Sequence, residues 1–305
     1  MGATSHGRSV SRYGDQFREF LRETWLGYAL ALPATVMLAV IILYPSLQAI
    51  WMSLFHESLL HPDAATWAGL SNYVRVFHDP LFWHALQNSV VLTTVAVSLE
   101  FLLGLGLAVV LKHKVPGIRF FRGVTMVTWV LPIIVTVITF NFLVQEPFGL
   151  VNLVFAKLGL PTGYWFGQTA PAFGLVIFMN VWRNAPFFAV ALMASMQAIP
   201  QSYYEAATLD GASPLQQFRY ITLPNISYTA MIMIVINTIF TFNNFSFVYL
   251  STGGGPYGST QVLATYVYKQ AFESYALGYA AAIGSIMLVI MLVFTIVYVE
   301  LETRE

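Results

Sequence analysis

The sequence predicts an all-α integral membrane protein with six transmembrane helices and both termini in the cytoplasm. Three observations support this fold class: the composition, the long apolar runs and the distribution of the basic residues. Hydrophobic residues make up 57% of the 305 residues, charged residues only 9%, and the mean hydropathy is +0.68. A soluble domain carries about 25% charged residues, so this composition is typical of a chain that resides in a bilayer.

The apolar runs define the spans in chain order. A helix needs about 20 predominantly apolar residues to cross the hydrocarbon layer, and six nearly charge-free runs are long enough. The first run is long enough to tilt or to extend beyond the bilayer. The predicted spans are 27–55, 86–111, 123–145, 171–198, 226–250 and 277–299.

The basic residues orient these spans. Ten of the 14 Lys and Arg residues fall before the first span, after even-numbered spans or in the C-terminal tail, and Arg183 falls within a span. The loops on the other side hold only Arg75, Lys157 and Lys269. Because cytoplasmic loops are enriched in Lys and Arg, we predict a cytoplasmic N-terminal segment (1–26), one membrane domain (27–299) with a cytoplasmic hairpin at 200–224, and a cytoplasmic tail (300–305).

The hairpin is the most informative polar segment. Ser202 to Glu205 has the pattern of a capping box, Gly211 provides a helix stop, and Ser213 to Gln216 is a second capping box with Pro at the first helical position. The pattern predicts two short helices. Helices of about eight residues are marginal alone in water, so we expect this hairpin to dock into a partner.

The same segment resembles a known family. Its Glu-Ala-Ala, Asp-Gly-Ala and Leu-Pro groups, in register over about 20 residues, resemble the cytoplasmic loop in permease subunits of binding-protein-dependent ABC importers. In that family the loop seats in a cleft of the ATPase subunit and transmits its motion. The matching residues are Glu205, Ala206, Ala207, Asp210, Gly211, Ala212, Leu223 and Pro224.

Segments outside the hairpin extend the resemblance over most of the chain. Gly69 to Ser89, Gly149 to Leu160 and Leu250 to Phe272 resemble the first of the two permeases in sugar importers of the maltose and glycerol-phosphate class. The resemblance implies a type I importer architecture in the cytoplasmic (inner) membrane of a prokaryote. It also implies a heterodimer with a second homologous permease, a dimer of ATPase subunits and an extracytoplasmic sugar-binding protein. The extra N-terminal spans and the large outer domain of the maltose prototype are missing, which leaves less outer surface for the binding protein.

Several chemistries are not supported by the sequence. No G-x-x-x-x-G-K-[ST] loop is present to cradle phosphates, so we expect ATP and Mg²⁺ to be bound by the partner ATPase and no cofactor by this chain. The six histidines show no metal-ligand spacing; His56 and His61 are the nearest pair and fit a solvated loop. No nucleophile–base pair or basic nucleic-acid patch is visible. The chain is therefore predicted to be a transport subunit and not an enzyme.

Polar residues inside the spans indicate where a substrate binds, because such groups are costly in a bilayer. The fourth span carries Asn180, Arg183 and Asn184 beside Phe187. The fifth span carries the second group, which is spaced i, i+3, i+4 and i+7 on one helix face and consists of Asn237, Phe240, Thr241 and Asn244. Counted from the hairpin, residues 183–187 and 237–241 both lie roughly 18–24 Å above the cytoplasmic boundary.

Amides, hydroxyls and aromatic rings at one level suit a sugar. The alternative is that these polar residues hold the helices together. The stretch Phe240 to Phe245 resembles the sugar-lining segment of the maltose permease, whereas Arg183 and Asn184 replace smaller or apolar lining residues. From the matched depth and this resemblance together, we predict that the substrate site is lined by Arg183, Asn184, Phe187, Asn237, Phe240, Thr241 and Asn244.

One acid lies well inside a span. Glu100 is about 11 residues into the second span, and we assign it a structural role, either capping a partner helix or pairing with Arg183. Arg183 could instead meet a substrate oxygen. A single acid does not make a proton or sodium relay, so the sequence favours an ATP-driven importer over a secondary transporter. The predicted substrate is a di- or oligosaccharide. The alternatives are a permease for glycerol-phosphate or another polyol and, in a different class, a stand-alone secondary transporter.

Overall fold

The computed structural model describes residues 25, 27–113 and 116–302. The N-terminal segment predicted at 1–26 falls outside this range, apart from Trp25, and so do residues 303–305 of the tail predicted at 300–305. Within the described chain, five helices are long and apolar enough to cross a membrane, and a bent pair of helices makes up to six. Most of the predicted spans are therefore confirmed.

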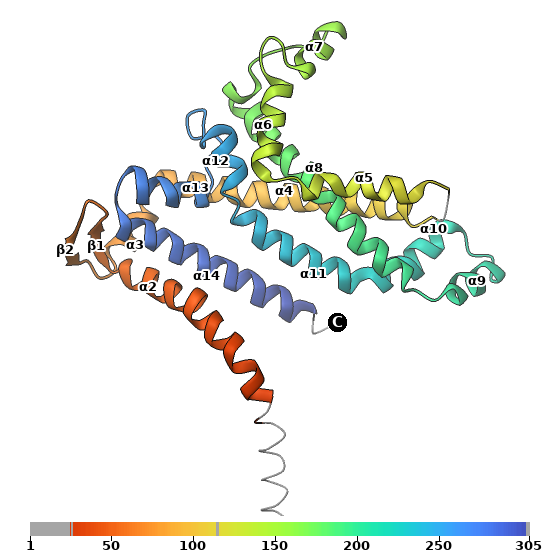
Figure 1. The fold of residues 1–305 in the computed structure, drawn as a ribbon, viewed down its shortest axis with the longest axis horizontal. Coiled ribbons are helices and arrows are strands. Elements are labelled where there is room, and N and C mark those ends of the chain that lie inside the picture. The colour runs from red at the N-terminus through yellow and green to blue at the C-terminus, as the bar shows by residue number, and fades with distance from the viewer. Residues whose placement is uncertain (1–24, 26, 114–115, 303–305) are drawn as a thin grey trace, which may run out of the picture.

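The long helices lie side by side and form the body of the molecule (Figure 1). The first runs from Gly27 to Met52 and includes η1 (Ala39–Leu43) and α2 (Tyr44–Met52). The others are α4 (Pro80–Leu111), α8 (Thr169–Gln197), α11 (Leu223–Phe242) and α14 (Leu277–Glu302). The shorter elements are α3 (Ser71–Phe77), α7 (Leu150–Lys157), η2 (Trp165–Gly167), α9 (Gln201–Leu209), α10 (Pro214–Gln217), η3 (Phe218–Thr222), α12 (Ser246–Thr252), α13 (Leu263–Tyr268) and η4 (Lys269–Glu273).

The third predicted span, 123–145, is not one straight helix. It consists of α5 (Ile118–Val130) and α6 (Ile133–Val144), which meet at an angle of 96°. Pro132 lacks a backbone N–H and disfavours a helical conformation for the residue before it, and Leu131 is extended, with ψ 136°. In Figure 1, α5 lies along the bundle, whereas α6 projects from it and carries α7 at its far end.

Two other expectations need correction. The fifth span, predicted at 226–250, ends at Phe242, and α12 begins at Ser246 after a short break. The fold is also not entirely helical, because β1 (Phe55–Ser58) pairs antiparallel with β2 (His61–Trp67). This small hairpin carries His56 and His61, both exposed, at the end of the bundle opposite α9 and α10 (Figure 1). The residues expected to form a solvated loop thus lie on exposed strands.

The body of the bundle depends on the close approach of α4 and α8, which pack along much of their length. Gly104 of α4 makes this approach possible. A Cβ atom at this position would lie 2.4 Å from Cβ of Phe188 and 3.0 Å from the carbonyl oxygen of Ala185. Helices in membranes commonly meet at such small residues because these let the backbones come together.

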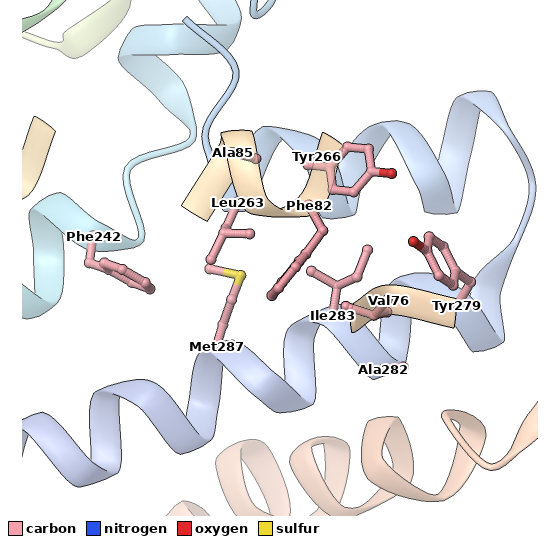
Figure 2. Close-up of a cluster of buried hydrophobic side chains, with 10 residues drawn as sticks. All are labelled: Val76, Phe82, Ala85, Phe242, Leu263, Tyr266, Tyr279, Ala282, Ile283 and Met287. Carbon is pink, nitrogen blue, oxygen red and sulfur yellow. The ribbon is translucent and has the colours of Figure 1, made fainter. Parts of the chain in front are cut away.

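A second packing centre lies at the end of the bundle that carries β1 and β2. Here α3, α4, α13 and α14 share a hydrophobic cluster, which Figure 2 shows. Tyr266 of α13 and Tyr279 of α14 extend their hydroxyl groups from this cluster, and both donate hydrogen bonds to Oδ2 of Asp79. Asp79 also caps α4, because its Oδ1 accepts from the backbone N–H of Leu81 at 2.9 Å. One carboxylate therefore ties three helices together.

The close approach of α4 and α8 predicts the outcome of a matched pair of substitutions. Gly104→Ala should lower the stability of the purified protein by about 1–3 kcal/mol, because the added methyl overpacks a fully buried contact. A Cβ atom added at Gly106 would have no neighbouring atom within 4 Å. Gly106→Ala should therefore be neutral or slightly stabilising, since Ala is the better helix former. Thermal unfolding of both variants tests this, and equal effects would contradict it.

The Asp79 anchor predicts a pH-dependent loss of stability. Burial raises the pKa of Asp79, but the hydrogen bonds from Tyr266, Tyr279 and the backbone outweigh it and leave the pKa below its ordinary value. The stabilisation from the carboxylate is then present above about pH 4 and is lost as the pH falls through the lowered pKa. Asp79→Asn should cost about 1–3 kcal/mol at neutral pH, and the difference from wild type should shrink on acidification.

Unfolding midpoints measured between neutral and acidic pH check this expectation. Asp63→Asn is the matched control, because Asp63 is exposed on β2. This substitution should leave the unfolding midpoint unchanged. A difference between wild type and Asp79→Asn that stays constant with pH would show that charge plays no part.

Candidate functional site

The hairpin between α8 and α11 forms the two predicted helices. The second capping box is confirmed: the backbone N–H of Ser213 donates to Oε1 of Gln216 at 2.7 Å, and that of Gln216 donates to Oγ of Ser213 at 3.4 Å. The first capping box is wrong. α9 begins at Gln201, two residues earlier than predicted, with Pro200 as its uncapped start. The fixed φ of Pro200, −57°, already suits a helix start, so Ser202 lies within the first turn.

Gly211 ends α9 as predicted. Its φ of +79° is in the left-handed region that favours glycine. The backbone N–H of Gly211 donates to the carbonyl of Thr208 at 3.1 Å, and that of Ala212 donates to the carbonyl of Ala207 at 2.8 Å. These bonds satisfy carbonyls at the end of the helix and turn the chain back toward α10.

The hairpin has polar attachments and no buried core of its own. Within α9 and α10 no residue is buried. The hydroxyl of Tyr204 bonds that of Thr222 at 2.9 Å, which ties α9 to the base of α11. Two leucines at the tip are almost fully open: Leu209 is 88% and Leu215 75% exposed. These open leucines agree with the expectation that the hairpin docks into a partner.

A cleft of about 1670 Å³ lies beside the hairpin, lined by the α4–α5 connection, the end of α8 and α9. Its basic wall includes Lys112, His113, Arg119 and Arg122. Arg122 donates to the carbonyl oxygen of Leu111 at the end of α4, through Nε at 3.1 Å and one terminal nitrogen at 2.6 Å. In the sequence, Lys112, Arg119 and Arg122 served only to orient the spans. No local sequence pattern indicates that they surround a cleft.

Three of the predicted residues on α8 are partly open, whereas Asn180 is fully buried. Arg183, Asn184 and Phe187 are all partly exposed. The ring of Phe187 stacks on that of Trp129 of α5, with centroids 4.9 Å apart and planes 7° apart. Trp129 was missed at the sequence level, because it approaches Phe187 only through the packing of α5 on α8.

The predicted stripe on α11 is split by the structure. Asn237 and Thr241 are only 5% and 3% exposed, whereas Phe240 is 71% exposed. Asn237 donates to the carbonyl of Met233 one turn below it, at 2.9 Å. Asn244 lies beyond the end of α11, where its Oδ1 accepts from the backbone N–H of Phe247 at 3.1 Å. The four residues therefore do not share one open helix face.

The shared level of α8 and α11 is supported by their packing. Phe188 of α8 and Met233 of α11 belong to one buried cluster with Val97 of α4. One helical turn farther from the hairpin lie Asn184 on α8 and Asn237 on α11. The depth counted along each helix from the hairpin thus agrees with the contact between them.

A polar network joins α4 to α8 at this level. Glu100 is fully buried, and its Oε1 accepts from Nδ2 of Asn184 at 3.2 Å. The same Nδ2 donates to Oδ1 of Asn180 at 2.8 Å, and Oδ1 of Asn184 accepts from a terminal nitrogen of Arg183 at 3.4 Å. Between Glu100 and Arg183, both described, the structure records no direct ion pair. Their connection runs through the amide of Asn184.

Metal chemistry finds no support in the described residues, where no three His, Cys, Asp or Glu side chains form a possible metal group. A multi-span helical bundle with an exposed polar hairpin, and polar groups at one depth in neighbouring spans, defines the class of membrane permeases. The chain belongs to a family within this class: residues 100–305 match the model of the binding-protein-dependent transport system inner membrane component.

Similar proteins agree with this assignment. The chain is 35% identical over 282 residues to the trehalose/maltose transport system permease protein MalF of Thermococcus litoralis, covering 92% of this chain and 94% of that one. It is 32% identical over 281 residues to the sulfoquinovosyl glycerol transport system permease protein SmoG of Agrobacterium fabrum, covering 92% and 91%.

Solved structures show the same fold. One chain of a bacterial ABC transporter involved in the import of the acidic polysaccharide alginate matches with a TM-score of 0.81 and 21% identity, covering 95% of this chain and 99% of that chain. A chain of an amino acid ABC transporter matches 76% of this chain with a TM-score of 0.53 and 19% identity. The type I importer permease architecture is therefore confirmed.

Proposed function

We propose that this chain is one of two permease subunits of an ATP-driven importer that moves a di- or oligosaccharide by alternating access across the cytoplasmic membrane of a prokaryote. A second homologous permease completes the pathway. A separate ATPase dimer binds ATP and Mg²⁺, and an extracytoplasmic binding protein delivers the sugar. The observation that carries this proposal is the open hairpin of α9 and α10, which turns at Gly211, has a capping box at the start of α10 and has no buried core.

The hairpin is suited to transmit force. It is short, its helices meet at the fixed turn of Gly211, and Tyr204 couples it to Thr222 at the base of α11. A displacement of Leu209 and Leu215 by a docked partner would move α8 and α11, because the hairpin connects directly to both helices. Driving a two-state equilibrium from 1:99 to 99:1 takes about 5.5 kcal/mol, which ATP and docking partners supply.

The relatives support a sugar as substrate, because one is named for trehalose and maltose and another for sulfoquinovosyl glycerol. Arg183, Phe187, Phe240 and Asn244 keep surface that a sugar can reach. Among the other proposed lining residues, Asn237 and Thr241 are buried at the same level, and the partly exposed Asn184 is hydrogen-bonded to Glu100 and Asn180.

A charged glycoside is the second candidate substrate. Arg183 favours it, since a guanidinium inside a membrane is a strong ligand for acidic groups. The same argument applies to a glycerol-phosphate ester.

Purification of the expressed transporter tests the class of function. The chain should copurify with a second permease and an ATPase, and uptake into proteoliposomes should require ATP and a binding protein. Uptake of sugar by the chain alone, driven by a proton or sodium gradient, would instead show a secondary transporter.

The hairpin predicts two uncoupling variants. Gly211→Pro should abolish uptake, because proline cannot adopt a φ of +79° and removes the N–H that bonds Thr208. Glu205→Lys should do the same by reversing an exposed charge on α9. Sugar binding by the separate binding protein should be intact in both. Transport assays with proteoliposomes check this.

The control for the charge reversal is Glu146→Lys. Glu146 is exposed between α6 and α7, well away from the hairpin (Figure 1), so ATP-driven coupling should persist. Normal uptake by Gly211→Pro and Glu205→Lys would remove the coupling role of α9 and α10.

A further inference from the structure

Unpartnered polar atoms gather where α4 meets α8. Among the described residues, five buried side-chain atoms lack a hydrogen-bond partner, and three of them belong to Glu100, Asn180 and Arg183. Glu100 and Asn180 are both fully buried. Buried polar atoms without partners are uncommon in native proteins and call for a reason. A network used only to hold the helices together would be expected to satisfy them.

The side-chain amide of Asn184 has a fixed orientation in this network. Its amide nitrogen points its hydrogens at Glu100 and Asn180, and its amide oxygen accepts from Arg183. The positive end of the amide dipole therefore faces the carboxylate and the negative end faces the guanidinium. Reversing the amide would set donor against donor and acceptor against acceptor, so the two charged side chains hold it in place.

The network joins two residues of opposite formal charge. Glu100 is the only Asp, Glu, Lys or Arg in α4, and Arg183 is the only one in α8. One amide separates them, a distance at which opposite charges in a medium of low dielectric constant still attract appreciably. Glu100 is inaccessible, whereas Arg183 is partly exposed on the side of α8 that carries Phe187. A ligand on that side would meet the guanidinium first.

We propose that Glu100 is a specificity-determining residue that acts through Asn184 to balance the charge of Arg183, so that the site on α8 takes an uncharged sugar and disfavours an acidic one. The inference rests on the proposed function and chooses between its two substrate classes. A balanced guanidinium still offers N–H donors to sugar hydroxyls. An unbalanced one would bind a carboxylate, sulfonate or phosphate with two charge-assisted bonds.

Glu100→Gln isolates the charge because it keeps the shape of the side chain. The full chain, in complex with the second permease and the ATPase, is placed in lipid nanodiscs without binding protein. Maltose and maltobiouronic acid are the two probes, since they differ only by a carboxylate in place of a hydroxymethyl group. Calorimetry, or the fluorescence of Trp129 and Trp182 near the site, gives the ratio of the two dissociation constants.

Wild type should bind maltose in preference to the acid. Glu100→Gln should shift the ratio toward the acid by about tenfold, and Arg183→Gln should shift it away. The double variant, which has neither charge, should return close to the wild-type ratio. Glu146→Gln, at an exposed carboxylate between α6 and α7, is the control and should leave the ratio unchanged.

The outcomes separate the inference from the proposed function. If maltose binds but the ratio is the same in all variants, Glu100 only braces the helices and the inference is overturned. A wild-type preference for the acid also overturns it. If the Glu100→Gln complex does not assemble, the double variant is compared with Arg183→Gln, and equal ratios in these two variants overturn the inference. If the assembled wild-type complex binds neither probe, the result contradicts both the proposed sugar transport and the role inferred for Glu100.

Discussion

The close contact of α4 with α8 is the constraint on which the rest of the bundle depends. Gly104 brings the two backbones so near that no side chain fits between them. In a bilayer, lipid tails are as apolar as leucine, so such packing and internal hydrogen bonds take over from the hydrophobic effect in holding helices together. The contact between α4 and α8 is therefore tight, and polar groups placed there have a restricted set of partners.

That restriction explains the arrangement of charges in the membrane. Glu100 lies one helical turn from Gly104 on the same helix and meets α8 at short range. An isolated buried carboxylate would be very costly, but Asn184 donates to it and in turn accepts from Arg183. The chain thus carries two opposite charges inside its spans without exposing either fully to lipid. In an alternating-access cycle, any movement between α4 and α8 must preserve or exchange these bonds.

Local chemistry made much of the fold predictable. Apolar runs located the spans, and the signals at Gly211 and Ser213 located the turn and second helix of the hairpin, because each depends on residues only a few positions apart. The misses have a physical reason as well. Pro132 was read as an ordinary residue of a continuous span, although proline changes the direction of the chain. Ser202 does not cap α9, because the helix already begins after Pro200, two residues earlier than the capping pattern predicts.

The sequence by itself determined the class of protein, the positions of its helices and the level of its polar groups, since these follow from composition, spacing and helical rise. Only the tertiary structure decided which of those groups face one another. Asn237 and Phe240 are one turn apart, yet one is buried and the other open, because α4 and α8 cover a single side of α11. Likewise Glu100 meets Asn184 across 84 residues of sequence, a contact that helix packing creates and no local pattern encodes.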